Sequence, residues 1–209
     1  MSDLYDAILN GKAPAAAAAT RQALEEGAAA LDLIQREMMP AMDEVGRRFE
    51  CEEYFVPELL LAGRAMKVAL ELLRPLLTSS GAQSAGRVII GTVKGDLHDI
   101  GKNIVASMLE GGGFEVIDLG ADVAPQKFID AITKNNAGLL CLSALLTVTM
   151  PGMKATIEAL RAAGLRERVK VMIGGAPVTQ RFADEIGADG YGENAPAAVT
   201  VARRLVAAS

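Results

Sequence analysis

The chain has 209 residues, 51% of them hydrophobic, so it can bury a sizeable core as one large domain or two small ones. Its formal net charge is -5, and no basic stripe interleaved with aromatic residues occurs, which disfavours nucleic acid as a partner. The longest apolar runs are too short to span a bilayer and the acidic N-terminus is unlike a signal peptide, so we expect a cytoplasmic protein with no membrane partner. The two cysteines, Cys51 and Cys141, lie far apart and outside any Cys/His cluster. They indicate neither a disulfide framework nor a zinc site, and we expect buried or incidental thiols.

The N-terminal part, from Asp3 to Leu77, has apolar residues at helical spacing. Residues 31–49 predict one long helix, with Pro40 as a candidate kink. A second long helix is predicted after Pro57, and Pro75 is expected to end it. With shorter helices at residues 3–9 and 14–25, this makes a four-helix bundle. The apolar stripe expected on the second long helix comprises Leu59, Leu60, Ala62, Gly63, Met66, Leu70 and Leu73.

A linker is predicted at residues 78–86, where large apolar groups are absent and turn-forming residues are dense. The predicted domains are therefore a helical module at residues 1–80 and a second domain at residues 86–209.

The second domain alternates short apolar runs with amphipathic stretches. This pattern predicts an α/β fold, a five-stranded parallel sheet in the flavodoxin-like (Rossmann-like) order with helices on both faces. Ligands in such folds bind at the carboxyl ends of the strands. The predicted strands are residues 88–93, 115–119, 138–143, 169–174 and 190–191, and the predicted helices are residues 101–111, 125–135, 151–163, 179–186 and 195–206.

His98, the only histidine, follows the first predicted strand in a loop bracketed by Gly95 and Gly101. Asp96 and Asp99 flank it, and a carboxylate bonded to one imidazole nitrogen raises the basicity of the other, which suits metal ligation. Two loop carboxylates beside a solvated histidine are the more frequent reason for such a triplet, so the triplet alone does not decide the question.

The helix after this loop could take Asp99 as its N-cap. A phosphate site is a rival explanation, but the glycine spacing matches neither known phosphate motif and two carboxylates would repel the anion. A receiver domain would need an aspartate at the end of the middle strand, where Ser143 stands instead. The face expected to pack on the sheet comprises Ile100, Ile104, Val105, Met108 and Leu109.

Three segments together carry a family resemblance. Residues 95–103, Gly-Asp-Leu-His-Asp-Ile-Gly-Lys-Asn, are similar to the DxHxxG signature of cobalamin-binding domains that bind the corrinoid base-off and histidine-on. Residues 143–149 resemble the second element of that family and residues 174–176 the third. In the helical half, residues 45–49 and 54–59 resemble the cap module of methionine synthase. The resemblance covers nearly the whole chain and extends to the corrinoid proteins of methylamine, methanol and O-demethylase methyltransferase systems.

The resemblance implies a role for each matched position. His98 would be the lower axial ligand of cobalt, Asp96 would accept its other N–H, and Thr149, where methionine synthase has serine, would donate to Asp96. Ser143, Leu145 and Thr147 would line the slot for the corrinoid's nucleotide, with Gly174 and Gly175 leaving room for it. Residues of the cap would cover the upper cobalt face. The full set expected to bind the cofactor is Gly95, Asp96, Leu97, His98, Asp99, Ile100, Gly101, Ser143, Leu145, Thr147, Thr149, Gly174, Gly175, Tyr191, Gly192, Glu193, Ala195, Met42, Val45, Phe49, Val56 and Leu59.

Plainer readings of several of these positions stay open. The hydroxyls at the end of the third strand could satisfy their own backbone, and the paired glycines could form an ordinary turn. The apolar residues of the helical half, Met42 and Phe49 among them, are more often bundle core than ligand contacts.

The function that the resemblance implies is that of a methyl carrier. Such a protein accepts a methyl group on cobalt from a substrate-specific methyltransferase and passes it to a second methyltransferase, with tetrahydrofolate or coenzyme M as acceptor. A reductive activase is a further implied partner. The main alternative is a cobalamin-dependent sensor or regulatory module, although this chain has neither the charge nor the spare length for a DNA-binding module. A mutase subunit and a domain without a cofactor are also weighed, and the cap motif argues against the mutase.

Overall fold

The structure is a computed structural model that describes residues 2–80 and 85–207. It divides into two compact units, one of residues 1–84 with 110–113 and one of residues 85–109 with 114–209. Of the predicted linker, residues 78–80 belong to a helix and residues 81–84 lie outside the described part of the chain.

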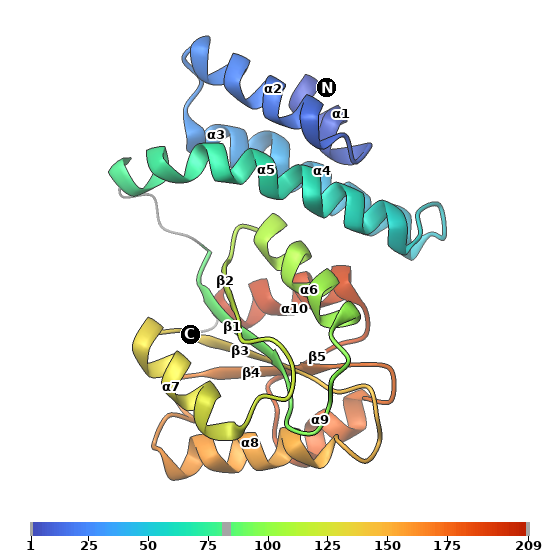
Figure 1. The fold of residues 1–209 in the computed structure, drawn as a ribbon, viewed down its shortest axis with the longest axis vertical. Helices are drawn as coiled ribbons and strands as arrows, with labels where there is room; N and C mark the ends of the chain where they lie inside the picture. Colours follow the sequence, from blue (N-terminus) through green and yellow to red (C-terminus); the bar gives the residue numbers. More distant parts are fainter. Residues whose placement is uncertain (1, 81–84, 208–209) are drawn as a thin grey trace. The chain divides into compact units, whose positions relative to one another are not determined.

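The first unit is built from helices (Figure 1). The helix predicted over residues 31–49 is present as one uninterrupted helical run, but its middle is a π-helix. Met39 N–H donates to the carbonyl of Ile34, five residues back. Pro40 follows directly, and a wider turn before it fits a residue that cannot donate and whose ring would crowd the carbonyl of a regular α-turn. The elements are α1 (Asp3–Leu9), α2 (Ala13–Glu25), α3 (Ala30–Leu33), η1 (Ile34–Met38), α4 (Met39–Glu50) and α5 (Val56–Ser80).

Helix α5 differs from its prediction in two ways. Pro75 does not end the helix, which continues to Ser80. The N–H that Pro75 lacks would have paired with the carbonyl of Glu71, and both residues are exposed, so water can replace the missing donor. Leu60 is 44% exposed, because it lies one position from Leu59 and thus about 100° off the buried stripe. Ala65 and Ala69 complete the buried face of α5 in its place, and α2 packs against this helix.

The second unit is the predicted α/β fold. Its five strands are all parallel and lie in the order β2-β1-β3-β4-β5, which confirms the flavodoxin-like arrangement. Helices α6 and α10 cover one face of the sheet, and α7, α8 and α9 cover the other (Figure 1). The elements are β1 (Arg87–Thr92), α6 (Ile100–Gly111), β2 (Glu115–Asp118), α7 (Pro125–Asn135), β3 (Leu139–Ser143), α8 (Pro151–Ala162), β4 (Lys170–Gly174), α9 (Gln180–Ile186), β5 (Gly190–Gly192) and α10 (Ala195–Ala207).

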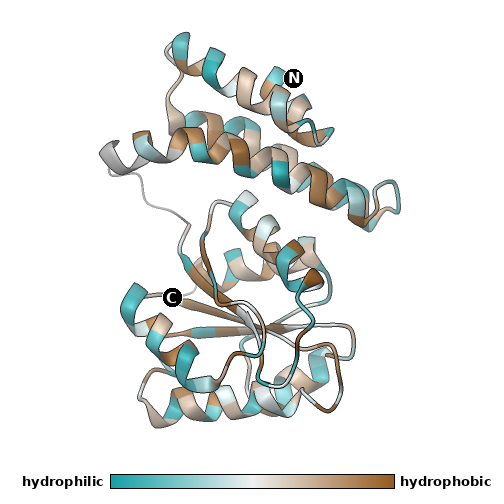
Figure 2. Ribbon diagram, viewed as in Figure 1, coloured by the Kyte–Doolittle hydropathy of each residue, from teal (hydrophilic) through white to brown (hydrophobic). Residues whose placement is uncertain are grey.

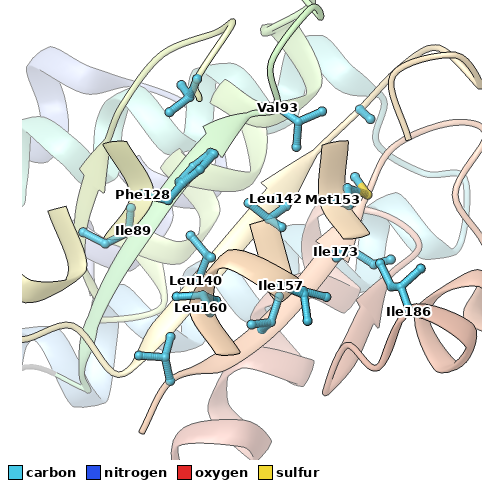
Figure 3. Packing of buried hydrophobic residues seen from close by; sticks show 14 of the residues in the cluster. Ile89, Val93, Phe128, Leu140, Leu142, Met153, Ile157, Leu160, Ile173 and Ile186 are labelled. Carbon is cyan, nitrogen blue, oxygen red and sulfur yellow. The ribbon is translucent and has the colours of Figure 1, made fainter. Parts of the chain in front are cut away.

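Alternate residues of the central strands make the core of this unit. Ile89, Leu140 and Ile173 point to the face covered by α7 and α8, where they meet Phe128 and Ile157 (Figure 3). The central strands β1 and β3 are apolar on both faces and are brown over most of their length in Figure 2, as expected for a sheet covered on both sides. Each such side chain contributes about 1.5–3 kcal/mol when fully buried.

The strands end together, which brings distant residues to one edge. Thr92 pairs in register with Ser143, Ser143 with Gly174, and Gly174 with Gly192. These four residues form a row across the carboxyl ends of β1, β3, β4 and β5. The loops that leave this row carry the predicted site.

The cysteines are in different surroundings. Cys141 is buried in β3 and burial raises the pKa of its thiol, whereas Cys51 is exposed after α4. Among the helices that the structure describes, none combines the length and apolar character needed to cross a membrane.

Candidate functional site

His98 lies in the loop between β1 and α6, and its backbone is held at both ends. The buried hydroxyl of Thr92 donates to the carbonyl of His98 over 2.9 Å. His98 N–H donates to Asp96 Oδ1 over 3.0 Å. The ring itself is half exposed. A rigid backbone therefore presents an accessible imidazole.

Asp96 is fully buried, and its carboxylate accepts hydrogen bonds from its own loop and from the loop after β3. Oδ1 accepts from His98 Nδ1 at 2.7 Å, and Oδ2 accepts from Thr149 Oγ1 at 2.7 Å. Oδ2 also accepts from the backbone N–H groups of Leu145 at 2.7 Å and Leu146 at 3.4 Å. Burial alone would raise the pKa of Asp96, but the hydrogen bonds from Thr149, Leu145 and His98 outweigh it and lower the pKa well below its usual range.

The charge of Asp96 decides which nitrogen of His98 is available. An ionised carboxylate is only an acceptor, so in the neutral imidazole Nδ1 carries the hydrogen and the lone pair is on Nε2. Among the described residues, Nε2 has no hydrogen-bond partner. The two hydrogen bonds expected of the relay, from His98 to Asp96 and from Thr149 to Asp96, are both present. A histidine with one nitrogen tied to a carboxylate and the other free is the usual arrangement of a metal ligand.

Large apolar side chains near His98 in the sequence and after β3 are exposed. Leu97 and Val148 are 77% and 80% exposed. Ile100 is 72% exposed, so its expected packing on the sheet is wrong; it is the first residue of α6 and precedes the buried stripe that Ile104, Met108 and Leu109 form. Leu145 and Leu146 are exposed by about two-fifths. Exposed apolar residues gathered on loops at the carboxyl edge are typical of a surface that binds an apolar ligand.

The glycines after β4 are required by the backbone itself. Gly175 has φ +133, and a Cβ there would lie 1.9 Å from the carbonyl oxygen of Ala144. A Cβ on Gly174 would lie 2.9 Å from the carbonyl oxygen of Gly192. Neither position can take a side chain, because the backbone of Ala144 and of Gly192 already occupies the space that a Cβ would need.

The glycines around His98 behave differently. Gly95 has φ +84, a conformation that favours glycine. Gly101 is in the first turn of α6, and a Cβ there would meet nothing within 4 Å. Asp99 precedes α6 directly, and its carbonyl accepts from Asn103 N–H over 2.8 Å. The protein alone therefore does not need glycine at position 101.

The remaining residues of the predicted slot also lie at this edge. Ser143 ends β3 and is half-buried, and Thr147 is exposed in the loop that follows. Tyr191 is half-buried against the apolar core, and burial followed by the nearby charge of Glu193 raises the pKa of its hydroxyl. Gly192 and Ala195 are buried and Glu193 is exposed. Contact of these residues with a nucleotide stays a prediction.

The residues expected from the helical half differ in exposure. Met42, Val45 and Leu59 are buried, Phe49 is half-buried and Val56 is 41% exposed. Their role in a cap likewise stays a prediction.

Three residues that support the His98 loop were missed from the sequence. Thr92 binds the carbonyl of His98, as described above. Asp122 in the loop after β2 binds Gly95 N–H at 2.8 Å, and the buried Lys102 binds Asp118 Oδ2 at 2.5 Å. The signal for Asp118 and Asp122 was available, because Asp118 ends and Asp122 follows the strand that is next to β1 in a flavodoxin-like sheet.

The residues present fit a corrinoid held through His98. The site offers one accessible imidazole nitrogen, exposed apolar side chains on the loops beside it, and open space at Gly101, where a Cβ would meet nothing within 4 Å. All three properties are found in the part of the chain that the structure describes.

Two family models match the chain. Residues 86–200 match a B12 binding domain, and residues 2–74 match a second model, also described as a B12 binding domain. The two matches correspond to the α/β and the helical unit.

Individual proteins show the same relationship. Dimethylamine corrinoid protein 1 of Methanosarcina acetivorans is 45% identical, over 99% of this chain and 97% of the relative. The structure of a cobalamin-binding protein from Desulfitobacterium hafniense DCB-2 is similar with a TM-score of 0.80 and 35% identity, over 97% of this chain and 96% of that one. A chain of the methanol:cobalamin methyltransferase complex MtaBC from Methanosarcina barkeri is similar with a TM-score of 0.85 and 31% identity, over 99% of this chain and 79% of that one. This chain belongs to the B12-binding family, and its cofactor is a corrinoid.

Proposed function

We propose that this protein is a methyl carrier that accepts a methyl group from a substrate-specific methyltransferase and passes it to a second methyltransferase. The observation that carries the proposal is His98, which presents Nε2 at the carboxyl edge of the sheet while ionised Asp96 holds Nδ1. The bound corrinoid supplies cobalt, which accepts and releases the methyl group. The protein supplies an axial ligand, a fixed orientation and control of access.

Each side chain has a defined part in this proposal. His98 Nε2 would be the protein's ligand to cobalt. Asp96 fixes the ring orientation and makes Nε2 more basic, and Thr149 holds Asp96 in place. The exposed Leu97 and Val148 would pack against the bound corrinoid and exclude water from the side that faces His98. Ser143 and Thr147, at the same edge as Gly174 and Gly175, would hold the nucleotide of the corrinoid.

The donor and the acceptor require partner enzymes. The described residues form a helical unit and one open sheet, with no barrel that could bind and activate a methyl donor. A methylamine is the donor class that the dimethylamine and trimethylamine corrinoid proteins support, since they are 45% and 42% identical to this chain. Likeness to a chain of a methyltransferase complex supports a methyltransferase partner. We propose tetrahydrofolate or coenzyme M as the acceptor of the second enzyme, and a reductive activase as a third partner.

Ligation by His98 is tested by reconstitution with cobalamin. The absorption spectrum of the wild-type protein should be that of a base-off, histidine-ligated form. His98→Ala should lose this spectrum, while Gln126→Ala, a change on the exposed side of α7, should keep it. Failure of the wild-type protein to bind cobalamin, or a histidine-ligated spectrum in His98→Ala, would contradict the proposal.

The carrier role needs a separate assay. The cobalamin-loaded protein is first reduced with a chemical reductant so that its cobalt is Co(I), which can accept a methyl cation. It is then mixed with candidate methyltransferases and with mono-, di- or trimethylamine or methanol, and methylation is followed spectroscopically. The methylated protein is then given tetrahydrofolate or coenzyme M with the second enzyme. A carrier should be methylated by one enzyme and demethylated by the other. A protein that binds cobalamin but takes part in neither transfer would instead indicate a sensor or regulatory module.

A further inference from the structure

Asp122 has a left-handed backbone conformation, which Asp adopts more readily than most non-glycine residues. It lies in the loop after β2 and has φ +56, in the left-handed region that few non-glycine residues adopt. Its side chain is about two-fifths exposed, so burial of the side chain does not account for this conformation. A conformation of this kind persists where the surroundings fix it, and such positions are often functional.

The contacts of Asp122 are with the loop that carries His98. Its carboxylate Oδ1 accepts from Gly95 N–H at 2.8 Å, and its own N–H donates to the carbonyl of Asp96 at 2.9 Å. These two hydrogen bonds hold two successive residues of the His98 loop, Gly95 and Asp96. Oδ2 accepts from Lys94 Nζ at 2.9 Å, and Gly95 N–H and Lys94 hold the pKa of Asp122 below its usual value.

The two loops are also joined along their length. Thr92 N–H donates to the carbonyl of Gly120, and Val123 N–H donates to the carbonyl of Thr92 at 3.0 Å. Val93 and Val123 form a parallel bridge beyond the ends of β1 and β2. The β2 loop therefore acts as an additional strand-like support for the residues that lead to His98.

We infer that Asp122 is a positioning residue for His98, acting through the backbone of Gly95 and Asp96. The side chain of Asp96 is held from the β3 side by Thr149 and Leu145, and its backbone is held from the β2 side by Asp122. Both hydrogen bonds between Asp96 and His98 go to the same oxygen, Oδ1, so a shift of the Asp96 backbone changes both at once. The inference deepens the proposed role of His98 as cobalt ligand and rests on it.

A purely structural role for Asp122 would make a different prediction. Loss of its contacts would then lower the stability of the unit without changing the state of the His98 ring. A positioning role requires that the ring lose its fixed tautomer, even where the protein stays folded. The state of the ring separates the two explanations.

The chain makes this measurement simple, because His98 is its only histidine. In the untagged apo-protein, at a pH where the ring is neutral, ¹⁵N NMR of the imidazole reports which nitrogen carries the hydrogen. The wild type should show the Nδ1–H tautomer. Asp122→Gly removes the carboxylate and relieves the left-handed backbone, and both ring nitrogens should shift towards the values of mixed tautomers. Asp122→Asn keeps an acceptor for Gly95 N–H and should restore the wild-type shifts.

Two controls complete the design. Glu115→Ala removes an exposed carboxylate at the far end of β2, where it pairs with Arg87, and should leave the ring unchanged. Asp122→Ala also lacks the acceptor and replaces the glycine variant if that variant does not fold. Wild-type nitrogen shifts in a folded Asp122→Gly or Asp122→Ala protein would overturn the inference.

The loaded protein gives an independent readout. Spectra of Asp122→Gly reconstituted with cobalamin should contain a several-fold smaller fraction of the histidine-ligated form, and those of Asp122→Asn should be close to wild type. If the wild-type protein bound no cobalamin, the proposed function would fail, while the NMR result on the apo-protein would still decide whether Asp122 positions the ring. If the wild type bound cobalamin through His98 and the glycine variant bound it equally, the inference alone would fail.

Discussion

The hydroxyl of Thr149 donates a hydrogen bond to the buried, charged carboxylate of Asp96. It donates to Asp96 Oδ2 at 2.7 Å, and methionine synthase has serine at the matching place. Thr149→Val keeps the shape and removes the donor, so we expect it to lower the free energy of unfolding by about 1.5–3 kcal/mol, the usual worth of a hydrogen bond to a charged group. The measurement is urea unfolding followed by the NMR signal of His98, which reports on the α/β unit alone.

Thr149→Ser is the matched control, since it keeps the hydroxyl. It should unfold within about 1 kcal/mol of the wild type, because it removes only one methyl group. Equal stability of the valine and serine variants would show that the hydrogen bond to Asp96 contributes nothing.

Replacing Gly175 or Gly101 by alanine should change the stability of the α/β unit in opposite directions. Gly175→Ala places Cβ against the carbonyl oxygen of Ala144 at φ +133, so it should destabilise the α/β unit by more than about 3 kcal/mol or prevent folding. Gly101→Ala meets open space within a helix and should stabilise the apo-protein by about 0.5 kcal/mol. Thermal unfolding of both variants without cobalamin makes the comparison.

Cobalamin binding then shows whether position 101 serves the ligand. If a corrinoid approaches the backbone there, Gly101→Ala should bind cobalamin more weakly although the apo-protein is no less stable. Unchanged affinity would mean that the glycine has no part in the site.

At the scale of elements, the central strands were predicted well because their residues are apolar on both faces and because helices of amphipathic pattern separate the strands. Helix α7 has its predicted bounds, Pro125–Asn135, since a proline at one end and a left-handed Asn136 at the other mark them in the sequence. The prediction that Pro75 ends the helix was wrong, because a proline ends a helix only where the missing hydrogen bond cannot be replaced. Whether solvent can replace it depends on the tertiary fold.

The site was predictable to the extent that it follows strand order. His98 and Ser143 could be placed at one edge because parallel strands share their carboxyl end. The contacts of Asp122 and Thr92 with the His98 loop could not be predicted, since they depend on the left-handed turn at Asp122 and on the path of two loops past each other. The exposure of Ile100 was missed for a related reason: helical periodicity does not say where the buried stripe begins.

Helix α4 offers a prediction about pH. Hydrogen bonds from Arg47 and Arg48 lower the pKa of Glu44 from 4.5 to about 2. A lowered pKa in the folded state means that this ion pair stabilises α4 above pH 4.5 and that the effect is lost as the pH falls towards 2. Glu44→Gln should therefore speed amide hydrogen exchange in α4 at pH 6, with a difference from the wild type that shrinks below pH 4.5.

Glu50→Gln, on the same helix, is the control. No hydrogen bond or ion pair of the Glu50 side chain is found among the described residues, so its loss should leave exchange unchanged at every pH. A constant ratio between Glu44→Gln and the wild type from pH 6 to pH 3 would contradict the assigned role of Glu44.

At the scale of the whole molecule, the chain consists of two units that match separate family models. The apolar cluster between the sheet and α7, α8 and α9 is drawn entirely from residues 89–186. His98 and the residues that hold it, Asp96 and Thr149, lie within the α/β unit, as do the supporting residues Thr92 and Asp122. Axial ligation of the corrinoid should therefore belong to this unit alone, and the proposed contribution of the helical unit is control of access.

A chain reduced to residues 86–209 should accordingly fold and keep the Nδ1–H tautomer of His98, because no contact that fixes the ring lies outside it. With cobalamin it should give the same histidine-ligated spectrum as the full chain. If the helical unit shields the upper cobalt face, azide should replace the upper water ligand of bound aquocobalamin several-fold faster in the short chain. If azide replaced the water ligand at the same rate in both chains and both showed the same histidine ligation, His98 would still be the ligand, but the helical unit would not act as a cap. Loss of ligation in a folded short chain would show that the helical residues take part in binding itself.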